Sequence, residues 1–155
     1  MSDFTNIRPA TGVDLEAIGE IAKRTELFPA EMVGDMAAGY TLGTSSDIWF
    51  VYEDDSRVLA FGFCEPERMT VGTWNLLAIG VTPEMQGNFI GAQMMAYLEA
   101  YLSRQGARIL LVETMGTPEF ARTREFYLKN NYVEEARIRE FYEAGADKVV
   151  FWKHL

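Results

Sequence analysis

The stretch whose residue types and spacing best suit ligand binding lies near the middle of the chain, at 81–95 (VTPEMQGNFIGAQMM). An apolar run ends before Pro83, a polar turn containing Gly87 follows, and apolar residues then recur at helical spacing from Ile90. The first N–H groups of such a helix lack intrahelical partners, and its dipole adds partial positive charge there. Because Gly87 and Gly91 carry no Cβ, a phosphate could approach this backbone closely. A tight strand-to-helix turn that binds nothing explains the glycine spacing equally well.

Other common catalytic groups are scarce in this chain. It has one cysteine, Cys64, and one histidine, His154. A single cysteine excludes an intrachain disulfide, and a cysteine nucleophile would need a histidine base beside it. This composition supports neither a Ser-His-Asp triad nor a dedicated metal site. We therefore expect structural roles for Cys64 and His154, and no metal.

The segment 81–95 resembles the acyl-CoA motif of the GNAT (Gcn5-related) N-acetyltransferases, Val-x-Pro-x-x-Gln/Arg-x-x-Gly-x-Gly/Ala. Val81, Pro83, Gln86 and Gly91 match this pattern. Phe89 stands where the family usually has its first glycine, and its ring could crowd a pyrophosphate or force a different loop conformation. The resemblance implies acetyl-CoA as co-substrate. It assigns to the cofactor Ile79, Gly80, Val81, Gln86, Gly87, Asn88, Phe89, Ile90, Gly91, Ala92 and Tyr127.

Acetyl transfer to an amine requires an enzyme to align the reactants, polarise the thioester, deprotonate an ammonium and protonate the departing thiolate. The segment 124–132 (REFYLKNNY) resembles the family's Phe-Tyr-x-x-x-Gly-Phe/Tyr, which implies Tyr127 as the general acid. Without the family, a tyrosine in an amphipathic helix explains this residue. The family often has a cofactor-binding asparagine at the position of Phe120.

The base and the oxyanion donor are less defined. Glu113, near the end of a predicted strand, could act as a base if partial burial raised its pKa, or could hydrogen-bond a loop or helix end. Water-mediated deprotonation is a further alternative. The N–H of Gly80 or Val81 could bind the oxyanion where the resemblance implies that the strand splays from its neighbour.

The acceptor pocket has only weak signals. By the resemblance, residues before and within the second helix line it, so we expect Phe28 and Met32 to contact substrate, with core packing as the alternative. Trp74 lies on the strand that enters the cofactor loop and could line the acceptor site or pack in the sheet.

Hydrophobic periodicity places these residues on an α/β framework. It predicts strands at 4–9, 48–52, 57–64, 73–81, 108–113, 136–142 and 148–152, and helices at 15–26, 29–42, 87–105 and from 117 to Asn130-Asn131, where asparagine can adopt a left-handed conformation. This order resembles that of the GNAT family over essentially the whole chain. It implies a single GNAT domain over residues 1–155. The expected fold is α/β (α+β), a mixed, mostly antiparallel sheet of about seven strands flanked by about four helices, with a cleft where strands 4 and 5 splay apart.

The length, hydrophobic content and net charge of the chain disfavour some classes of function. The chain has 155 residues, 48% of them hydrophobic, which suits one domain with a substantial core. A net charge of -9 disfavours nucleic acid and suits a cationic substrate, or solubility alone. The start of the chain has no basic region typical of a signal peptide, and no apolar run is long enough to span a membrane. We expect a cytoplasmic protein without a membrane partner.

These observations predict an N-acetyltransferase that moves an acetyl group from acetyl-CoA to a primary amine of a small molecule by direct attack in a ternary complex. The alternative is a degenerate GNAT domain that binds acyl-CoA as a non-catalytic sensor or partner module, and a domain that keeps only the fold is a further one. A homodimer could form through C-terminal aromatic residues, with packing inside the sheet as the more common role of such residues: Phe141, Tyr142, Phe151 and Trp152.

Overall fold

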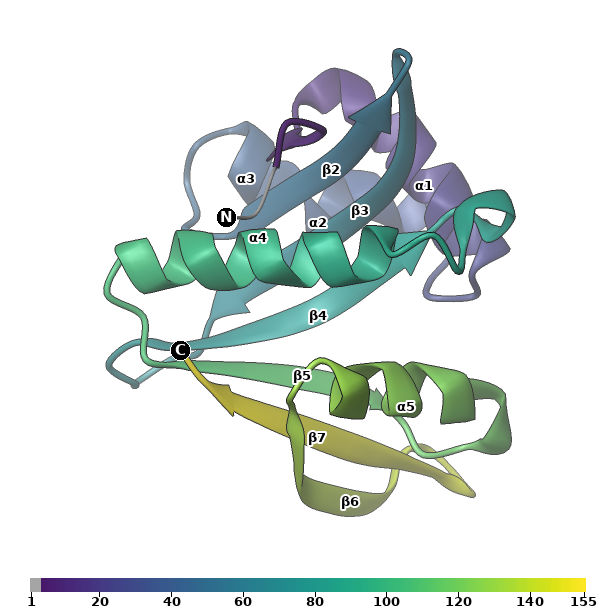
Figure 1. The fold of residues 1–155 in the computed structure, drawn as a ribbon, viewed down its shortest axis with the longest axis vertical. Helices are drawn as coiled ribbons and strands as arrows, with labels where there is room; N and C mark the ends of the chain where they lie inside the picture. Colours follow the sequence, from purple (N-terminus) through teal and green to yellow (C-terminus); the bar gives the residue numbers. More distant parts are fainter. Residues whose placement is uncertain (1–3) are drawn as a thin grey trace.

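The computed structural model describes residues 4–155, which form one seven-stranded sheet with helices on both faces (Figure 1). The strands are β1 (Ile7–Pro9), β2 (Ile48–Asp54), β3 (Arg57–Pro66), β4 (Thr73–Val81), β5 (Ile109–Met115), β6 (Val133–Glu143) and β7 (Ala146–His154), in the sheet order β1-β2-β3-β4-β5-β7-β6. The α-helices are α1 (Leu15–Arg24), α2 (Val33–Met36), α3 (Ala38–Thr41), α4 (Ile90–Arg104) and α5 (Ala121–Lys129).

The sheet opens between β4 and β5. These strands are parallel, whereas every other neighbouring pair is antiparallel. Their pairing extends only from Thr73 opposite Ile109 to Leu76 opposite Val112. Beyond that point β4 continues along β3 to Val81, while β5 continues along β7 to Met115. The predicted fold, with its cleft between the fourth and fifth strands, is confirmed.

A β-bulge marks the point where the strands separate. Phe63 of β3 lies opposite Ala78, but the next residue, Cys64, lies opposite Leu76, so Leu77 is an extra residue in β4. A bulge bends its strand and increases the local twist. The bulge therefore lies immediately after the last β4–β5 pair and accompanies the divergence of β4 from β5.

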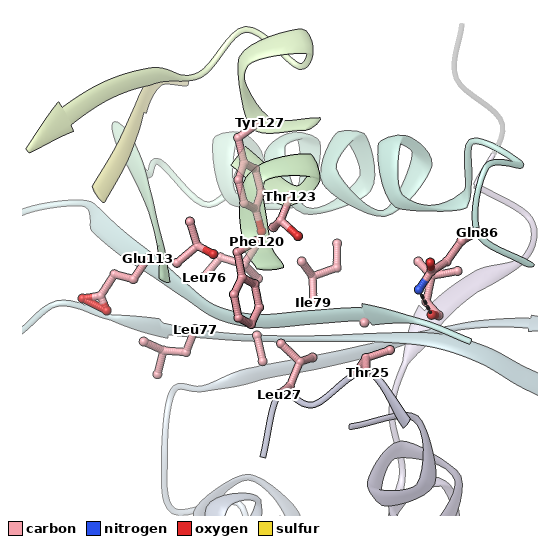
Figure 2. A pocket seen from close by; sticks show the side chains of 14 residues that line it. Thr25, Leu27, Leu76, Leu77, Ile79, Gln86, Glu113, Phe120, Thr123 and Tyr127 are labelled. Carbon is pink, nitrogen blue, oxygen red and sulfur yellow. Dashed lines mark hydrogen bonds between the residues drawn. The ribbon is translucent and has the colours of Figure 1, made fainter. Parts of the chain in front are cut away.

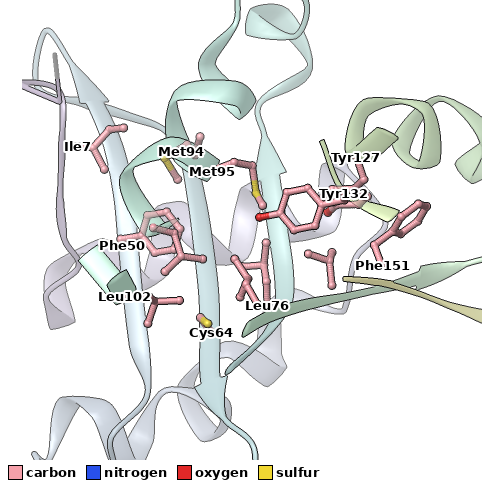
Figure 3. Close-up of a cluster of buried hydrophobic side chains, with 14 of the residues drawn as sticks. Ile7, Phe50, Cys64, Leu76, Met94, Met95, Leu102, Tyr127, Tyr132 and Phe151 are labelled. Carbon is pink, nitrogen blue, oxygen red and sulfur yellow. The ribbon is translucent and has the colours of Figure 1, made fainter. Parts of the chain in front are cut away.

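Separate hydrophobic clusters hold the helices on the sheet. Helices α4 and α5 lie on one face, where their cluster includes Phe50, Leu76, Leu98, Leu110 and Phe151 (Figure 3). Helix α1 and the short helices after it cover the other face over β2, β3 and part of β4, with a cluster that includes Ile18, Trp49, Phe61 and Phe63. Side chains alternate between these faces along the strands except at the bulge, where Leu77 and Ala78 both belong to the cluster on the α1 side.

Some helix boundaries differ from the predictions. The segment predicted as one helix at 29–42 consists of a 3-10 turn (Ala30–Met32), α2 and α3. Helix α4 begins at Ile90 rather than at Gly87, because Phe89 has a left-handed backbone (φ 64°) that the helix cannot include. Asn131 is left-handed, as predicted (φ 70°).

Candidate active site

The opening in the sheet contains a cavity of about 180 Å³ (Figure 2). Leu76, Ile79 and Tyr127 line it and belong to the α4–α5 cluster, whereas Leu27 and Leu77 line it from the α1 side. The cavity is therefore accessible to groups from both faces of the sheet, so that two reactants could meet there. Its complete lining is Thr25, Leu27, Leu76, Leu77, Ala78, Ile79, Gly80, Val81, Gln86, Glu113, Thr114, Phe120, Thr123 and Tyr127.

The turn before α4 offers a continuous row of backbone donors. The helix's first intrahelical bond is from the N–H of Gln93 to the carbonyl of Phe89, at 3.1 Å. Across residues 4–155, no hydrogen bond is made by any amide of the run 87–92, which the sequence assigned to the cofactor. Such donors at a helix N-terminus form an anion site. The predicted phosphate-binding residues thus form one continuous turn whose amides have no partner among residues 4–155.

Phe89 adopts the backbone conformation for which the family's glycine is suited. Its φ is 64°, and Gly87 also has a positive φ, 84°. The Phe89 side chain is 79% exposed. The ring therefore points away from the core, and the loop has not changed its conformation to avoid the left-handed region. The left-handed backbone costs a non-glycine residue roughly 1–2 kcal/mol.

The backbone of β4 determines which amides face the opening. The N–H of Thr82 donates to the carbonyl of Leu59 in β3, at 2.8 Å. Because backbone groups alternate in direction along a strand, those of Gly80 also face β3, while those of Ile79 and Val81 face the opening. The Val81 carbonyl accepts a hydrogen bond from Gln86 Nε2 at 3.1 Å, which ties the loop to the strand. Of the two predicted oxyanion donors, Val81 has the suitable direction and Gly80 does not.

The glycines at 80 and 91 allow close packing of neighbouring elements. A Cβ at Gly80 would lie 3.1 Å from both Leu27 Cδ1 and Phe61 Cε1, and one at Gly91 would lie 3.2 Å from the Phe126 ring. Gly91 therefore lets α5 approach the start of α4. This packing is an additional reason for the motif glycine, beside the close approach of a phosphate that the sequence predicts.

Tyr127 extends from α5 into the cavity on the α4–α5 side (Figure 2). The residue is 3% exposed, and its hydroxyl forms no hydrogen bond with any of the residues that the structure describes. Burial alone raises the pKa of its phenol above the usual value, so the hydroxyl stays protonated at neutral pH. Phe120 and Thr123, from the same helical segment, line the cavity beside it.

Glu113 lines the cavity but is paired. Its carboxylate forms an ion pair with Lys148 of β7, and both side chains are largely buried, at 18% and 14% exposure. The Lys148 ammonium also lies 4.2 Å from the centre of the Phe141 ring. The Lys148 ammonium occupies this carboxylate, so an acceptor amine could reach it only after the pair has opened. The structure thus locates Glu113 near the predicted reaction centre without leaving it free.

The residues predicted for the acceptor are not gathered at the cavity. Phe28 packs edge-to-face on Phe61, and Met32 is 47% exposed on the 3-10 turn before α2. Trp74 packs in the α4–α5 cluster, on the face opposite α1. The α1 side of the cavity is instead lined by Thr25 and Leu27, just after α1, neither of which the sequence marks as a site residue.

Comparison with known proteins agrees with this geometry. A family model described as an acetyltransferase (GNAT) domain matches residues 45–134. No match is found among curated proteins. A solved GNAT-family structure from Desulfovibrio desulfuricans superimposes with a TM-score of 0.87 at 24% identity, covering 96% of this chain and 97% of that chain.

Functionally described structures share the fold at lower identity. An aminoglycoside 6'-N-acetyltransferase complexed with coenzyme A has a TM-score of 0.78 and 17% identity, with 96% of each chain covered. The ribosomal-protein-S18-alanine N-acetyltransferase from Escherichia coli has a TM-score of 0.76 and 18% identity, covering 96% of this chain and 92% of that chain. Because the family model spans more than half of the sequence, and the fold and the opened sheet agree with it, the chain belongs to the GNAT acetyltransferase family.

Proposed function

We propose that this protein is an N-acetyltransferase that moves the acetyl group of acetyl-CoA to a primary amine of a small molecule, by direct attack in a ternary complex. The observation that carries the proposal is the adjacency of two features. A row of amides without partners among residues 4–155 lies at the start of α4, and the cavity between β4 and β5 begins beside it at Gln86 and Val81. A pyrophosphate on the amides would direct the rest of the cofactor into the cavity.

Each reaction requirement has a residue suited to it. The N–H of Val81 faces the opening and can polarise the thioester carbonyl. The protonated Tyr127 hydroxyl can donate to the departing thiolate from the α4–α5 side. The amine would approach from the side of Thr25 and Leu27. Glu113 serves as a base only when an acceptor separates it from Lys148; otherwise the ammonium loses its proton through water.

A non-catalytic acyl-CoA-binding module is the second candidate, and Phe120 favours it. This residue stands where the family often has a cofactor-binding asparagine, and its side chain lines the cavity together with Leu27 and Leu77 (Figure 2). A ring there offers no hydrogen bond to a cofactor amide and reduces the free volume. In this second case acetyl-CoA would bind without turnover.

Calorimetric titration with acetyl-CoA, followed by an assay of thiol release with a panel of small primary amines, separates these functions. An enzyme would bind with micromolar or tighter affinity, about -8 kcal/mol or better, and would release thiol only when a suitable amine is present. Saturable binding without release by any amine would favour the sensor. Undetectable binding in both the native chain and a Phe120→Asn variant would contradict both functions.

The proposal extends to the location of the protein in the cell and to its oligomeric state. We expect it in the cytoplasm; within residues 4–155, no helix is long and apolar enough to cross a membrane. A homodimer could use Phe141 and Tyr142, which are 52% and 39% exposed on β6. Phe151 is buried in the α4–α5 cluster, so for this residue interior packing, the alternative to an interface, is the one that the structure shows.

A further inference from the structure

The face of the sheet that carries the acceptor side of the cavity also carries a group of acidic side chains. Cys64 and Leu76 belong to the cluster under α4 and α5, so their strand neighbours Glu65 and Asn75 project from the opposite face. Glu65 and Asn75 lie directly opposite each other in β3 and β4. Leu77, on the same face, lines the cavity.

Asn75 has an unpaired acceptor within this group. It is 3% exposed, and its Nδ2 donates to Glu67 Oε1 at 2.8 Å, which fixes the orientation of the amide. Its Oδ1 is buried and accepts no hydrogen bond from any residue in 4–155. A buried carbonyl oxygen without a donor is costly. The Glu67 carboxylate therefore holds the amide by its Nδ2, and the Oδ1 of the same amide is left needing a donor.

Within residues 4–155, no ion pair neutralises the two carboxylates of this group. Neither Glu65 nor Glu67 forms an ion pair with a described residue, whereas Glu113, further along this face, is paired with Lys148. Desolvation, followed by repulsion from Asp47, Glu67 and Glu113, raises the pKa of Glu65, and the exposed Arg68 lowers it. The unpaired atoms are thus all acceptors, and their complement is a ligand that carries only donors, of which an ammonium is the simplest.

We propose that Glu65, Glu67 and Asn75 bind a second ammonium group of the acceptor, so that the substrate is an aliphatic diamine. This inference rests on the proposed function. Asn75 and Leu77 are separated by two strand residues, about 7 Å, which sets the spacing between the bound ammonium and the reacting amine. The ammonium near Leu77 first loses one proton to water, and the resulting amine attacks the thioester carbonyl, so that the C–N bond forms and the C–S bond breaks. Tyr127 protonates the departing thiolate, and the second proton that the nitrogen loses replaces the proton of Tyr127.

The first test measures binding without cofactor. Calorimetry of the protein alone should give 1,4-diaminobutane an affinity at least about tenfold higher than that of 1-aminobutane, since a charge-assisted pair is added. The shorter 1,2-diaminoethane should bind no better than the monoamine, because it cannot span the distance. Equal affinities for 1,4-diaminobutane and 1-aminobutane would overturn the proposal.

Variants assign the effect to these residues. Glu65→Gln should remove most of the preference for the diamine, and Asn75→Leu should reduce it, with thermal melting to confirm that each variant folds. Glu16→Gln, which removes the same charge from an exposed position on α1, should retain the preference. A preference that survives Glu65→Gln and Glu67→Gln together would overturn the assignment.

Turnover distinguishes the failure of this inference from the failure of the proposed function. An active enzyme that gives equal KM values for diamine and monoamine would contradict the second-ammonium site alone. A chain that binds the diamine selectively but releases no thiol would contradict the enzyme and leave the site intact. In an active enzyme, Glu65→Gln should act mainly on the KM of the diamine, raising it about tenfold or more.

Discussion

At the scale of single residues, Tyr127 combines features that suit a general acid. Its hydroxyl reaches the cavity, has no partner among residues 4–155, and remains protonated because burial raises its pKa. A tyrosine that served only the core would be expected to place its hydroxyl on a hydrogen-bond partner, as Tyr132 does with Glu99 at 2.6 Å. The contrast between these two neighbours supports a chemical role for Tyr127.

Replacing Tyr127 by phenylalanine should lower the rate of acetyl transfer about 100-fold, the usual contribution of a positioned acid. Acetyl-CoA affinity should change little, because the ring is retained. The assay is thiol release at saturating acetyl-CoA and amine. Tyr101→Phe removes the same atom from α4 at a position outside the cavity lining and should leave the rate unaltered. A rate unchanged by Tyr127→Phe would show that water protonates the thiolate.

Phe89 is the residue at which sequence and backbone conformation conflict. Phe89→Asn should raise the free energy of unfolding by about 1 kcal/mol, because asparagine tolerates the left-handed region better than phenylalanine does. Phe89→Ala removes the ring but keeps a Cβ at the same φ, so it should give no such gain. Urea denaturation measures both. If Asn and Ala variants were equally stable, the left-handed backbone would not be the source of the cost.

At the scale of secondary-structure elements, local sequence patterns predicted the fold well wherever apolar periodicity was long. The strand before the cofactor loop, the helix after it and the left-handed Asn131 are examples. The split of 29–42 into short helices was not predictable from periodicity, since its apolar residues do not show where the backbone turns. The bulge at Leu77 depends on the register with β3, which is a nonlocal property.

The site was predictable only in its local part. The residues of the predicted phosphate loop are contiguous, so a motif identifies them together. The ion pair of Glu113 with Lys148 joins strands far apart in the sequence, and the position of Leu27 at the cavity depends on how α1 packs. Neither contact has a local signature. The acceptor side of the site therefore required the three-dimensional structure.

The pairing of β2 with β3 depends on a glycine opposite an aromatic ring. Gly62 lies opposite Phe50, and a Cβ at Gly62 would come within 2.3 Å of Phe50 Cζ. Gly62→Ala should therefore lower the free energy of unfolding by about 1–3 kcal/mol through overpacking. Gly34→Ala in α2 meets no atom within 4 Å and should be neutral or stabilising. Equal stability of the two variants in urea would show that the Phe50 ring moves aside freely.

At the scale of the whole molecule, buried tyrosines connect the helices on one face to the sheet. Tyr132 donates to Glu99 of α4, and Lys153 of β7 contacts the same carboxylate at 3.0 Å. Tyr127 packs against both Tyr132 and Phe151. Desolvation is the largest cause of the raised pKa of each tyrosine, and the negative charge of Glu99 raises the pKa of Tyr132 further. These residues therefore make stability depend on pH on the alkaline side.

The stability of the folded protein falls as the pH rises above about 10, because tyrosine in the unfolded chain ionises near that pH. Below pH 10 both states keep the phenol proton, and the stabilisation is fully present. Above pH 10 the unfolded state loses protons that the folded state keeps, so the free energy of unfolding falls by up to about 1.4 kcal/mol per pH unit for each tyrosine. Tyr127→Phe loses no hydrogen bond to a described residue. In urea denaturation, the free energy of unfolding of this variant should equal that of the native protein at pH 7 and exceed it by about 1.4 kcal/mol at pH 11.

Tyr132→Phe provides the matched comparison. It gives up the bond to Glu99, so it should be less stable than the native protein by about 2 kcal/mol at pH 7. That deficit should shrink toward pH 11, since the variant has no phenol to ionise on unfolding. The free energy of unfolding could instead change with pH in the same way for the native protein and both variants between pH 7 and pH 11. That result would mean that neither phenol is protected from ionisation in the folded protein. Tyr127 would then be open to solvent, and its protonated state at the reaction centre would no longer be explained by burial.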